Sequence, residues 1–189
     1  SIDAVAHRHG PDAPHTHAEI RALLNTLERQ VCQPSAPHHD HVLYVVLADH
    51  GMVESDPRRT VYLNLHPHLA GCQKYLRRNR EGRLLVPGGS CRDMFLYVRP
   101  ECLDEAYGYF GERLAPWAQV RRVSDMVSAG YFGREEPGAA FFGRAGDLVI
   151  LPYRNQTVWW YEPERFQHRQ PGFHGGLTRS ELEIPLLLW

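Results

Sequence analysis

An unbroken run of apolar residues in the first third of the chain is its clearest pattern. Residues 42–47 are all apolar, and the run stops at Asp49, His50 and Gly51. A run of this length predicts a strand buried on both faces, as in the middle of a parallel α/β sheet, where ligands bind beyond the carboxyl ends of the strands. A carboxylate and an imidazole at that position suit a divalent transition metal, above all zinc. Taken alone, the same residues also fit a helix N-cap beside an ordinary histidine.

The pattern before this strand is helical. Within residues 12–31, Ile20, Leu23 and Leu27 recur at intervals of three and four, and charged residues fall between them. This spacing predicts an amphipathic helix packed on a sheet. A loop over residues 33–41 would connect the helix to the buried strand and complete an α/β unit.

The middle of the chain predicts a different mixture of elements. The glycine-rich and charged residues 130–146 are expected to form a loop. Residues 60–145 therefore predict a smaller α+β subdomain, inserted into an α/β core made of residues 1–59 and 146–189. The predicted strands are 60–65, 83–86, 94–98, 119–123, 147–151 and 184–189, the last of them buried, and the predicted helices are 100–114 and 124–129.

Composition narrows the class of protein. The chain has 189 residues, of which 43% are hydrophobic and 23% charged, as in an ordinary globular domain. A net charge of -1 gives no electrostatic reason to expect nucleic acid or an anionic membrane as a partner. No stretch reaches the length of a membrane helix, so we expect a soluble protein, either cytoplasmic or periplasmic. The four cysteines lack C-x-x-C spacing, which argues against a cysteine zinc site.

Two further places in the chain contain candidate metal ligands. Asp3 and His7 are four residues apart, so on a helical turn they would point to one side, although with 12 histidines such a pair also arises by chance. His174 precedes two glycines, which allow the backbone to come close to a bound group. Thr178 and Glu181 then have the spacing of a capping box for one turn of helix.

The order of these motifs resembles that of a known family. The chain reads D-A-V-A-H-R-H-G-P, then A-D-H-G-M after the predicted strand, then H-G-G before the last strand. This is similar to the type I phosphodiesterases and nucleotide pyrophosphatases of the alkaline phosphatase superfamily, which carry D-x-x-G-H-x-x-G-P, S-D-H-G-M and H-G-G. Ala6 replaces the usual Gly and Ala48 the usual Ser, and neither change removes a ligand. The resemblance implies an alkaline-phosphatase-like α/β fold with a mixed, mainly parallel sheet flanked by helices.

The resemblance also implies a site for two divalent metal ions. Asp3, His7 and His174 would bind one ion, and Asp49 with His50 would bind the other. Zinc is the first expectation, with manganese or iron as alternatives. In the family, a Thr or Ser nucleophile bridges the metals and forms a covalent intermediate.

One part of the family pattern is missing from the sequence. Family members carry a strand ending in an Asp ligand, and a helix whose N-terminus bears the nucleophile, before the first motif. Neither is present here, so we assign no catalytic nucleophile in this chain. We expect the C-terminal part of a longer enzyme, whose N-terminal half would be its partner. The second metal site would then be incomplete, and the fragment would have little or no activity.

The expected function is metal-dependent hydrolysis of phosphodiester or nucleotide pyrophosphate bonds, with a small phosphate ester or nucleotide as substrate. Two other functions fit the same motifs. One is a phosphomonoesterase or phosphonate hydrolase of the same superfamily. The other is a non-catalytic metal-binding or regulatory domain that keeps the fold alone.

Overall fold

A computed structural model describes residues 1–35 and 41–188, and the chain divides into two compact units. The first unit contains residues 1–55 and 170–189, and the second contains residues 56–169. These boundaries differ from the expected 1–59 with 146–189, because the strand predicted at 147–151 pairs inside the second unit. Most of the predicted loop 33–41, and the last residue of the predicted strand 184–189, lie outside the described residues.

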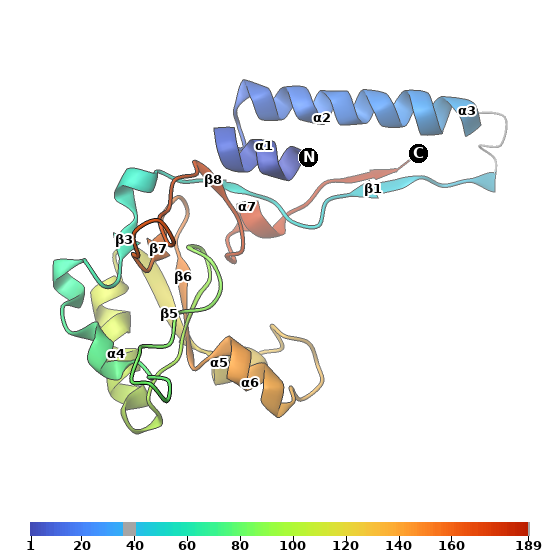
Figure 1. Ribbon diagram of the computed structural model, residues 1–189. Coiled ribbons are helices and arrows are strands. Elements are labelled where there is room, and N and C mark those ends of the chain that lie inside the picture. The colour runs from blue at the N-terminus through green and yellow to red at the C-terminus, as the bar shows by residue number, and fades with distance from the viewer. Residues whose placement is uncertain (36–40, 189) are drawn as a thin grey trace. The chain divides into compact units, whose positions relative to one another are not determined.

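The first unit combines a helical hairpin with two short β-ribbons (Figure 1). Helix α2 begins at a proline in the first helical position, where the missing N–H removes no hydrogen bond. It continues without a break through a π-helical turn into α3, so the predicted helix is confirmed. The helices are α1 (Ile2–His9), α2 (Pro14–Leu27), the π-helix Glu28–Cys32, α3 (Gln33–Ser35) and α7 (Arg179–Leu182), and the strands are β1 (Val45–Leu47), β2 (Val53–Glu54), β8 (Gly172–Phe173) and β9 (Leu186–Leu188).

The central strand β1 differs from its prediction in two ways. It pairs antiparallel with β9, and it is exposed: Val45 retains 49% and Leu47 59% of their accessible surface. The predicted last strand exists as β9, but all three of its residues are exposed. The apolar runs therefore predicted the strands correctly and their burial wrongly. Within the described residues, neither face of this ribbon is fully covered.

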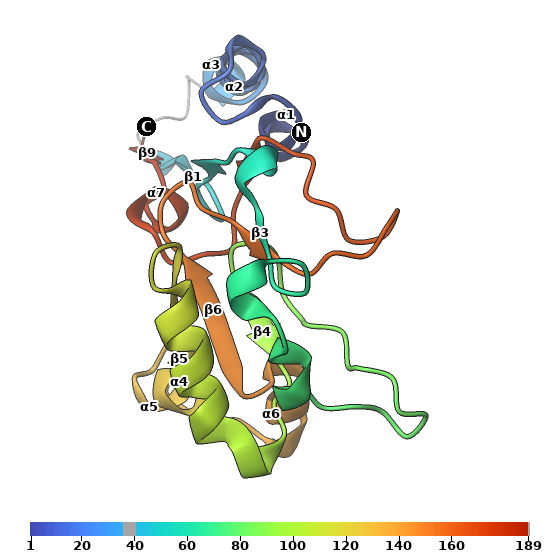
Figure 2. The same cartoon turned by 90° about the vertical axis from the view of Figure 1, so that its left-hand side faces the viewer.

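The second unit contains a well-packed core. Its three-stranded antiparallel sheet has the order β4-β6-β5, and α4 packs against it (Figure 2). Phe110 and Leu114 of α4 are fully buried, and burial of each such side chain contributes about 1.5–3 kcal/mol. The elements are β3 (Val61–Tyr62), β4 (Met94–Leu96), α4 (Leu103–Leu114), β5 (Ala118–Arg122), α5 (Val123–Ser128), α6 (Ala139–Ala145), β6 (Leu148–Pro152) and β7 (Val158–Trp159), with 3-10 turns at Pro57–Arg59, Pro67–Leu69, Cys72–Tyr75 and Pro100–Cys102.

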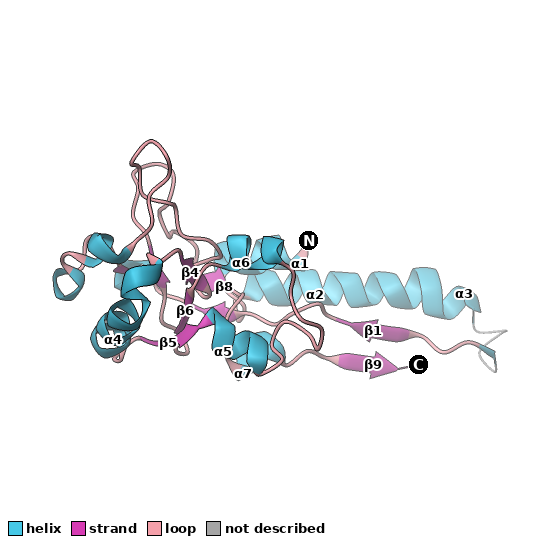
Figure 3. Cartoon of the chain, turned by 90° about the horizontal axis from the view of Figure 1, so that it is seen from below, coloured by secondary structure: helices cyan, strands magenta, loops and turns pink. Residues whose placement is uncertain are grey.

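The α/β class is confirmed, with helices and small sheets in both units (Figure 3). The mainly parallel sheet is wrong, because β3 with β7 is the one parallel pair among the described strands. Residues 83–86 form no strand, since only Leu84 makes an isolated bridge, to Arg78. The predicted loop 130–146 contains α6. Among the helices of the described residues, none has the length and apolar composition needed to cross a bilayer.

Candidate metal centre

Helix α1 places Asp3 and His7 on one face. Its first turn is capped by Ser1, whose side-chain oxygen accepts from the backbone N–H of Ala4 at 3.5 Å. Asp3 lies in that first turn, where the helix dipole favours a carboxylate. The Asp3 Oδ1 atom lies 3.5 Å from Nε2 of His7. The four-residue spacing thus brings a carboxylate and an imidazole together, as the sequence predicted.

The imidazole of His7 is held by the β8 segment. Its Nδ1 atom lies 2.7 Å from the backbone carbonyl oxygen of Gly172, so Nδ1–H donates to that oxygen. The ring edge also packs on Phe173, with 5.1 Å between centroids. In the neutral form of a histidine, an Nδ1–H that bonds a carbonyl leaves Nε2 free to bind a metal, which is the arrangement found in most metal-binding histidines. Here that Nε2 is the atom directed at Asp3.

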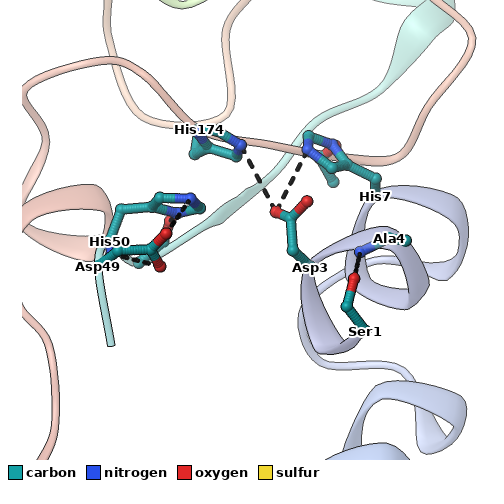
Figure 4. Close-up of polar contacts among 9 residues, drawn as sticks. Ser1, Asp3, Ala4, His7, Asp49, His50 and His174 are labelled. Carbon is teal, nitrogen blue, oxygen red and sulfur yellow. Dashed lines mark hydrogen bonds and ion pairs between the residues drawn. The ribbon is translucent and has the colours of Figure 1, made fainter. Parts of the chain in front are cut away.

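His174 follows β8 directly and completes the cluster. Its Nε2 atom also lies 3.5 Å from Asp3 Oδ1, and Figure 4 shows the two imidazoles on either side of the carboxylate. One ligand atom from each of the three residues lies within 4.8 Å of the others. With metal bonds of roughly 2.0–2.1 Å, the ligand atoms of a tetrahedral zinc site are about 3.3–3.5 Å apart. The two distances from Asp3 Oδ1 match this spacing, so Asp3, His7 and His174 form a candidate site for one zinc-sized ion.

The environment of His174 favours the neutral imidazole that a metal requires. Partial burial lowers its pKa from the ordinary value of 6.5, and the neighbouring His50 and His7 lower it further. Asp3 and Asp49 act in the opposite direction, with smaller effects. A neutral imidazole near pH 7 accepts a metal without first losing a proton.

Asp49 and His50 lie beside this cluster. The His50 ring stacks on His174, with centroids 3.7 Å apart, while its Nδ1–H donates to the carbonyl oxygen of Gly51 at 2.9 Å. The Asp49 Oδ2 atom is 3.7 Å from His50 Nε2, and its carboxylate is 90% exposed. Among the described residues these two belong to no group of three candidate ligands. The structure thus brings three of the five predicted ligands into one cluster, stacks His50 on His174 and leaves Asp49 exposed beside them.

Two loops carry candidate ligands, and close backbone contacts with α7 hold one of them in place. We call residues 49–51 the D-H-G loop and residues 174–176 the H-G-G loop. The N–H of Gly51 donates to the carbonyl oxygen of Glu181 at 2.8 Å. A Cβ atom at Gly51 would lie 2.1 Å from the carbonyl oxygen of Ser180, which explains why glycine is needed there. No local pattern of residues indicates this contact between the D-H-G loop and α7.

An apolar groove opens next to the cluster within the first unit. It has a volume of about 550 Å³, and its lining comes from α1, α2, β1, β9 and the D-H-G loop. Asp3, Asp49 and His50 lie on its wall. Its apolar lining consists of Ile2, Ala6, Pro11, Ile20, Leu23, Leu24, Val46, Leu47, Ala48, Met52, Pro185 and Leu187. An amphipathic helix packed directly on a sheet was predicted here, whereas an apolar groove is lined by both α2 and the β1–β9 ribbon.

Comparison with known proteins places the chain in a family. Residues 1–176 match the family model for type I phosphodiesterase / nucleotide pyrophosphatase. No curated protein sequence matches the chain.

Solved structures agree with this match at the level of the fold. Murine ectonucleotide pyrophosphatase / phosphodiesterase 5 superposes with a TM-score of 0.64 at 17% identity, covering 97% of this chain and 44% of its own. Phosphonoacetate hydrolase from Sinorhizobium meliloti, in complex with phosphonoformate, superposes with a TM-score of 0.63 at 19% identity. The match covers 98% of this chain and 43% of the hydrolase. The chain thus spans less than half the length of these two proteins.

Proposed function

Because the chain belongs to the type I phosphodiesterase / nucleotide pyrophosphatase family, we propose that it forms the metal-binding part of a hydrolase of phosphodiester or nucleotide pyrophosphate bonds. The observation that carries this proposal is the convergence of Asp3, His7 and His174, whose carboxylate lies 3.5 Å from both Nε2 atoms. Three ligands leave positions open for phosphate oxygens, as in other catalytic metal sites. A bound divalent ion would polarise a phosphoryl oxygen and stabilise the charge that develops on it.

Each of the three candidate ligands has a distinct part in binding the ion. Asp3 supplies negative charge from the first turn of α1, and the carbonyl oxygen of Gly172 orients the His7 imidazole. His174 approaches from the opposite side on the H-G-G loop. Zinc suits this set of one carboxylate and two imidazoles, and manganese or iron would accept the same ligands.

Asp49 and His50 would bind a second ion. Two ligands do not complete a site, so another residue has to approach the D-H-G loop. The adjacent groove, with its exposed Leu23 and Leu47, is the kind of surface that a further polypeptide covers. We propose that this polypeptide is the other half of the same protein, and that it provides the Thr or Ser nucleophile and the missing ligand. These 189 residues alone would then hydrolyse substrate slowly or not at all.

A phosphonate hydrolase is the second candidate. The likeness to phosphonoacetate hydrolase, with a TM-score of 0.63, is as strong as that to the murine enzyme. A structure of the murine ectonucleotide pyrophosphatase / phosphodiesterase 5 contains AMP, and the bacterial hydrolase contains phosphonoformate, so the two candidates predict different substrates for this protein.

Two measurements test the proposal. Zinc titration of the 189-residue chain, followed by equilibrium dialysis, should give one tightly bound ion. The full-length gene product should hydrolyse bis-p-nitrophenyl phosphate faster than p-nitrophenyl phosphate or phosphonoacetate. Absence of zinc binding by the chain would contradict the proposed site, and preference for phosphonoacetate would favour the second candidate.

A further inference from the structure

Glu181 makes more contacts than its place in a capping box explains. The residue lies in the four-residue helix α7, yet only 2% of its surface is exposed. A capping-box glutamate ordinarily accepts from the N-cap backbone N–H at the protein surface. Burial of a carboxylate is costly unless hydrogen bonds replace its hydration, so contacts beyond the cap are expected at this position.

The carboxylate of Glu181 holds the H-G-G loop. Its Oε1 atom accepts from the backbone N–H of Gly176 at 3.0 Å. Its Oε2 atom accepts from the N–H of Thr178 at 3.2 Å and from the Thr178 hydroxyl at 2.6 Å. The bond to Gly176 lies outside the helix and reaches the third residue of the loop that carries His174. A Cβ atom at Gly176 would lie 2.7 Å from Oε2, so this approach requires glycine.

The backbone of the same residue holds the D-H-G loop. The carbonyl oxygen of Glu181 accepts from Gly51 N–H at 2.8 Å, and the carbonyl oxygen of Gly51 in turn accepts from the His50 ring at 2.9 Å. Glu181 therefore contacts both loops, one through its side chain and the other through its main chain. The imidazoles of His50 and His174, one from each loop, stack with centroids 3.7 Å apart.

We propose that Glu181 is a positioning residue, which fixes the spacing between His50 and His174 by bonding the H-G-G loop with its carboxylate and the D-H-G loop with its carbonyl group. The relevance to metal binding rests on the function proposed above, whereas the loop spacing itself does not. Residues that orient metal ligands without binding the metal commonly lower the metal affinity by about 10–100-fold when they are replaced.

The test compares Glu181→Gln with Glu183→Gln. Glutamine keeps the size of Glu181, but its amide has one acceptor oxygen and one NH2 donor group, so it cannot accept from both Gly176 and Thr178 as the carboxylate does. Glu183 provides a matched control, since it lies two residues away, pairs with Arg179 and is 60% exposed. Both variants remove one negative charge from the same segment. Circular dichroism of each variant verifies that the fold is retained.

Two readouts separate the loop spacing from the metal site. In the metal-free chain, the nuclear Overhauser effect between the His50 and His174 ring protons should weaken in Glu181→Gln and persist in Glu183→Gln. In Co²⁺ titrations followed by visible absorption, Glu181→Gln should bind about 10–100-fold more weakly with an altered spectrum, and the control should match the wild type. If the wild type bound no Co²⁺, the proposed function would fail. The nuclear Overhauser measurement on the metal-free chain would still decide the role of Glu181.

A second variant keeps the test decisive if Glu181→Gln does not fold. Gly176→Ala leaves the glutamate in place but sets a methyl group against its carboxylate, so it should produce the same two changes. The proposal would be overturned if either variant folded and kept both the wild-type Co²⁺ affinity and the nuclear Overhauser effect between the His50 and His174 rings.

Discussion

The Oδ1 atom of Asp3 lies 3.5 Å from the Nε2 atom of His174, although the two residues come from opposite ends of the chain. Helix α1 supplies the carboxylate and the H-G-G loop supplies the imidazole. Because His7 lies at the same distance from that carboxylate, the three residues form one candidate ligand set.

Removal of an imidazole should abolish tight metal binding. We expect His174→Ala to lower zinc affinity by more than about 100-fold, because loss of a direct ligand exceeds the effect of outer partners. His17→Ala is the matched control, since His17 is exposed on α2 in the same unit. Competition with a chromophoric chelator measures both affinities. Equal affinities in the two variants would remove His174 from the site.

Acid should destabilise the metal-free first unit. The lowered pKa of His174 means that the folded state binds fewer protons than the unfolded state just below the ordinary value of 6.5. Stability therefore falls as the pH drops through 6.5 toward the lowered pKa, and it is unaffected well above 6.5. The exposed His9 has a lowered pKa and contributes with the same sign.

Amide hydrogen exchange in α1 and β8 between pH 7.5 and 5.5, corrected for intrinsic rates, measures this effect. His174→Asn should flatten the dependence. Asp56 and Glu105 also have lowered pKa values, but they titrate below about pH 4.5 and lie in the second unit. Protection that increased toward pH 5.5 would contradict the assigned sign.

Two glycines should respond to alanine in opposite directions. At Gly51 the added methyl group would meet the Ser180 carbonyl oxygen at 2.1 Å, so Gly51→Ala should cost about 1–3 kcal/mol of local stability. At Gly108, inside α4, nothing lies within 4 Å of the added carbon. Gly108→Ala should therefore gain about 0.5–1 kcal/mol through its better helix propensity. Hydrogen exchange in α7 and in α4 reports each change, and a tolerated Gly51→Ala would argue against the tight approach of the loops.

The exposed ribbon should make the isolated chain associate. Leu186 is 64% exposed on β9, next to other exposed apolar residues of β1, and an apolar edge of this kind recruits further chains. We expect Leu186→Lys to reduce self-association in sedimentation velocity. Leu65→Lys provides the control, because Leu65 is 58% exposed and lies in the second unit. An equal effect of both substitutions would mean that the ribbon has no special role.

Residue spacing along the chain predicted that Asp3 and His7 lie together, but it did not predict the approach of His174. The spacing of Asp3 and His7 predicts a shared helical face, and α1 provides it. The approach of His174 depends on how β8 pairs with β2, which no local pattern encodes. Only the order of motifs across the chain connected it to the other ligands. The capping box at Glu181 was predicted and is present, whereas its bond to Gly176 depends on the path of the loop.

The errors in the fold have similar physical causes. An unbroken apolar run indicates that a strand can be buried, but not which neighbours cover it, so the exposure of Val45 and Leu47 was missed. The frequent glycines of residues 130–146 predict a loop, although Gly138 and Gly146 lie at the two ends of helix α6. Glycines at helix ends are common, and the apolar residues between them were the better signal.

Anomalous diffraction at the zinc edge, from crystals of the zinc-loaded chain, tests the central claim most directly. We predict a strong peak bonded to one carboxylate oxygen of Asp3 and to the Nε2 atoms of His7 and His174, at about 2.0–2.2 Å. A zinc ion bound elsewhere, with these three side chains uncoordinated, would contradict the account.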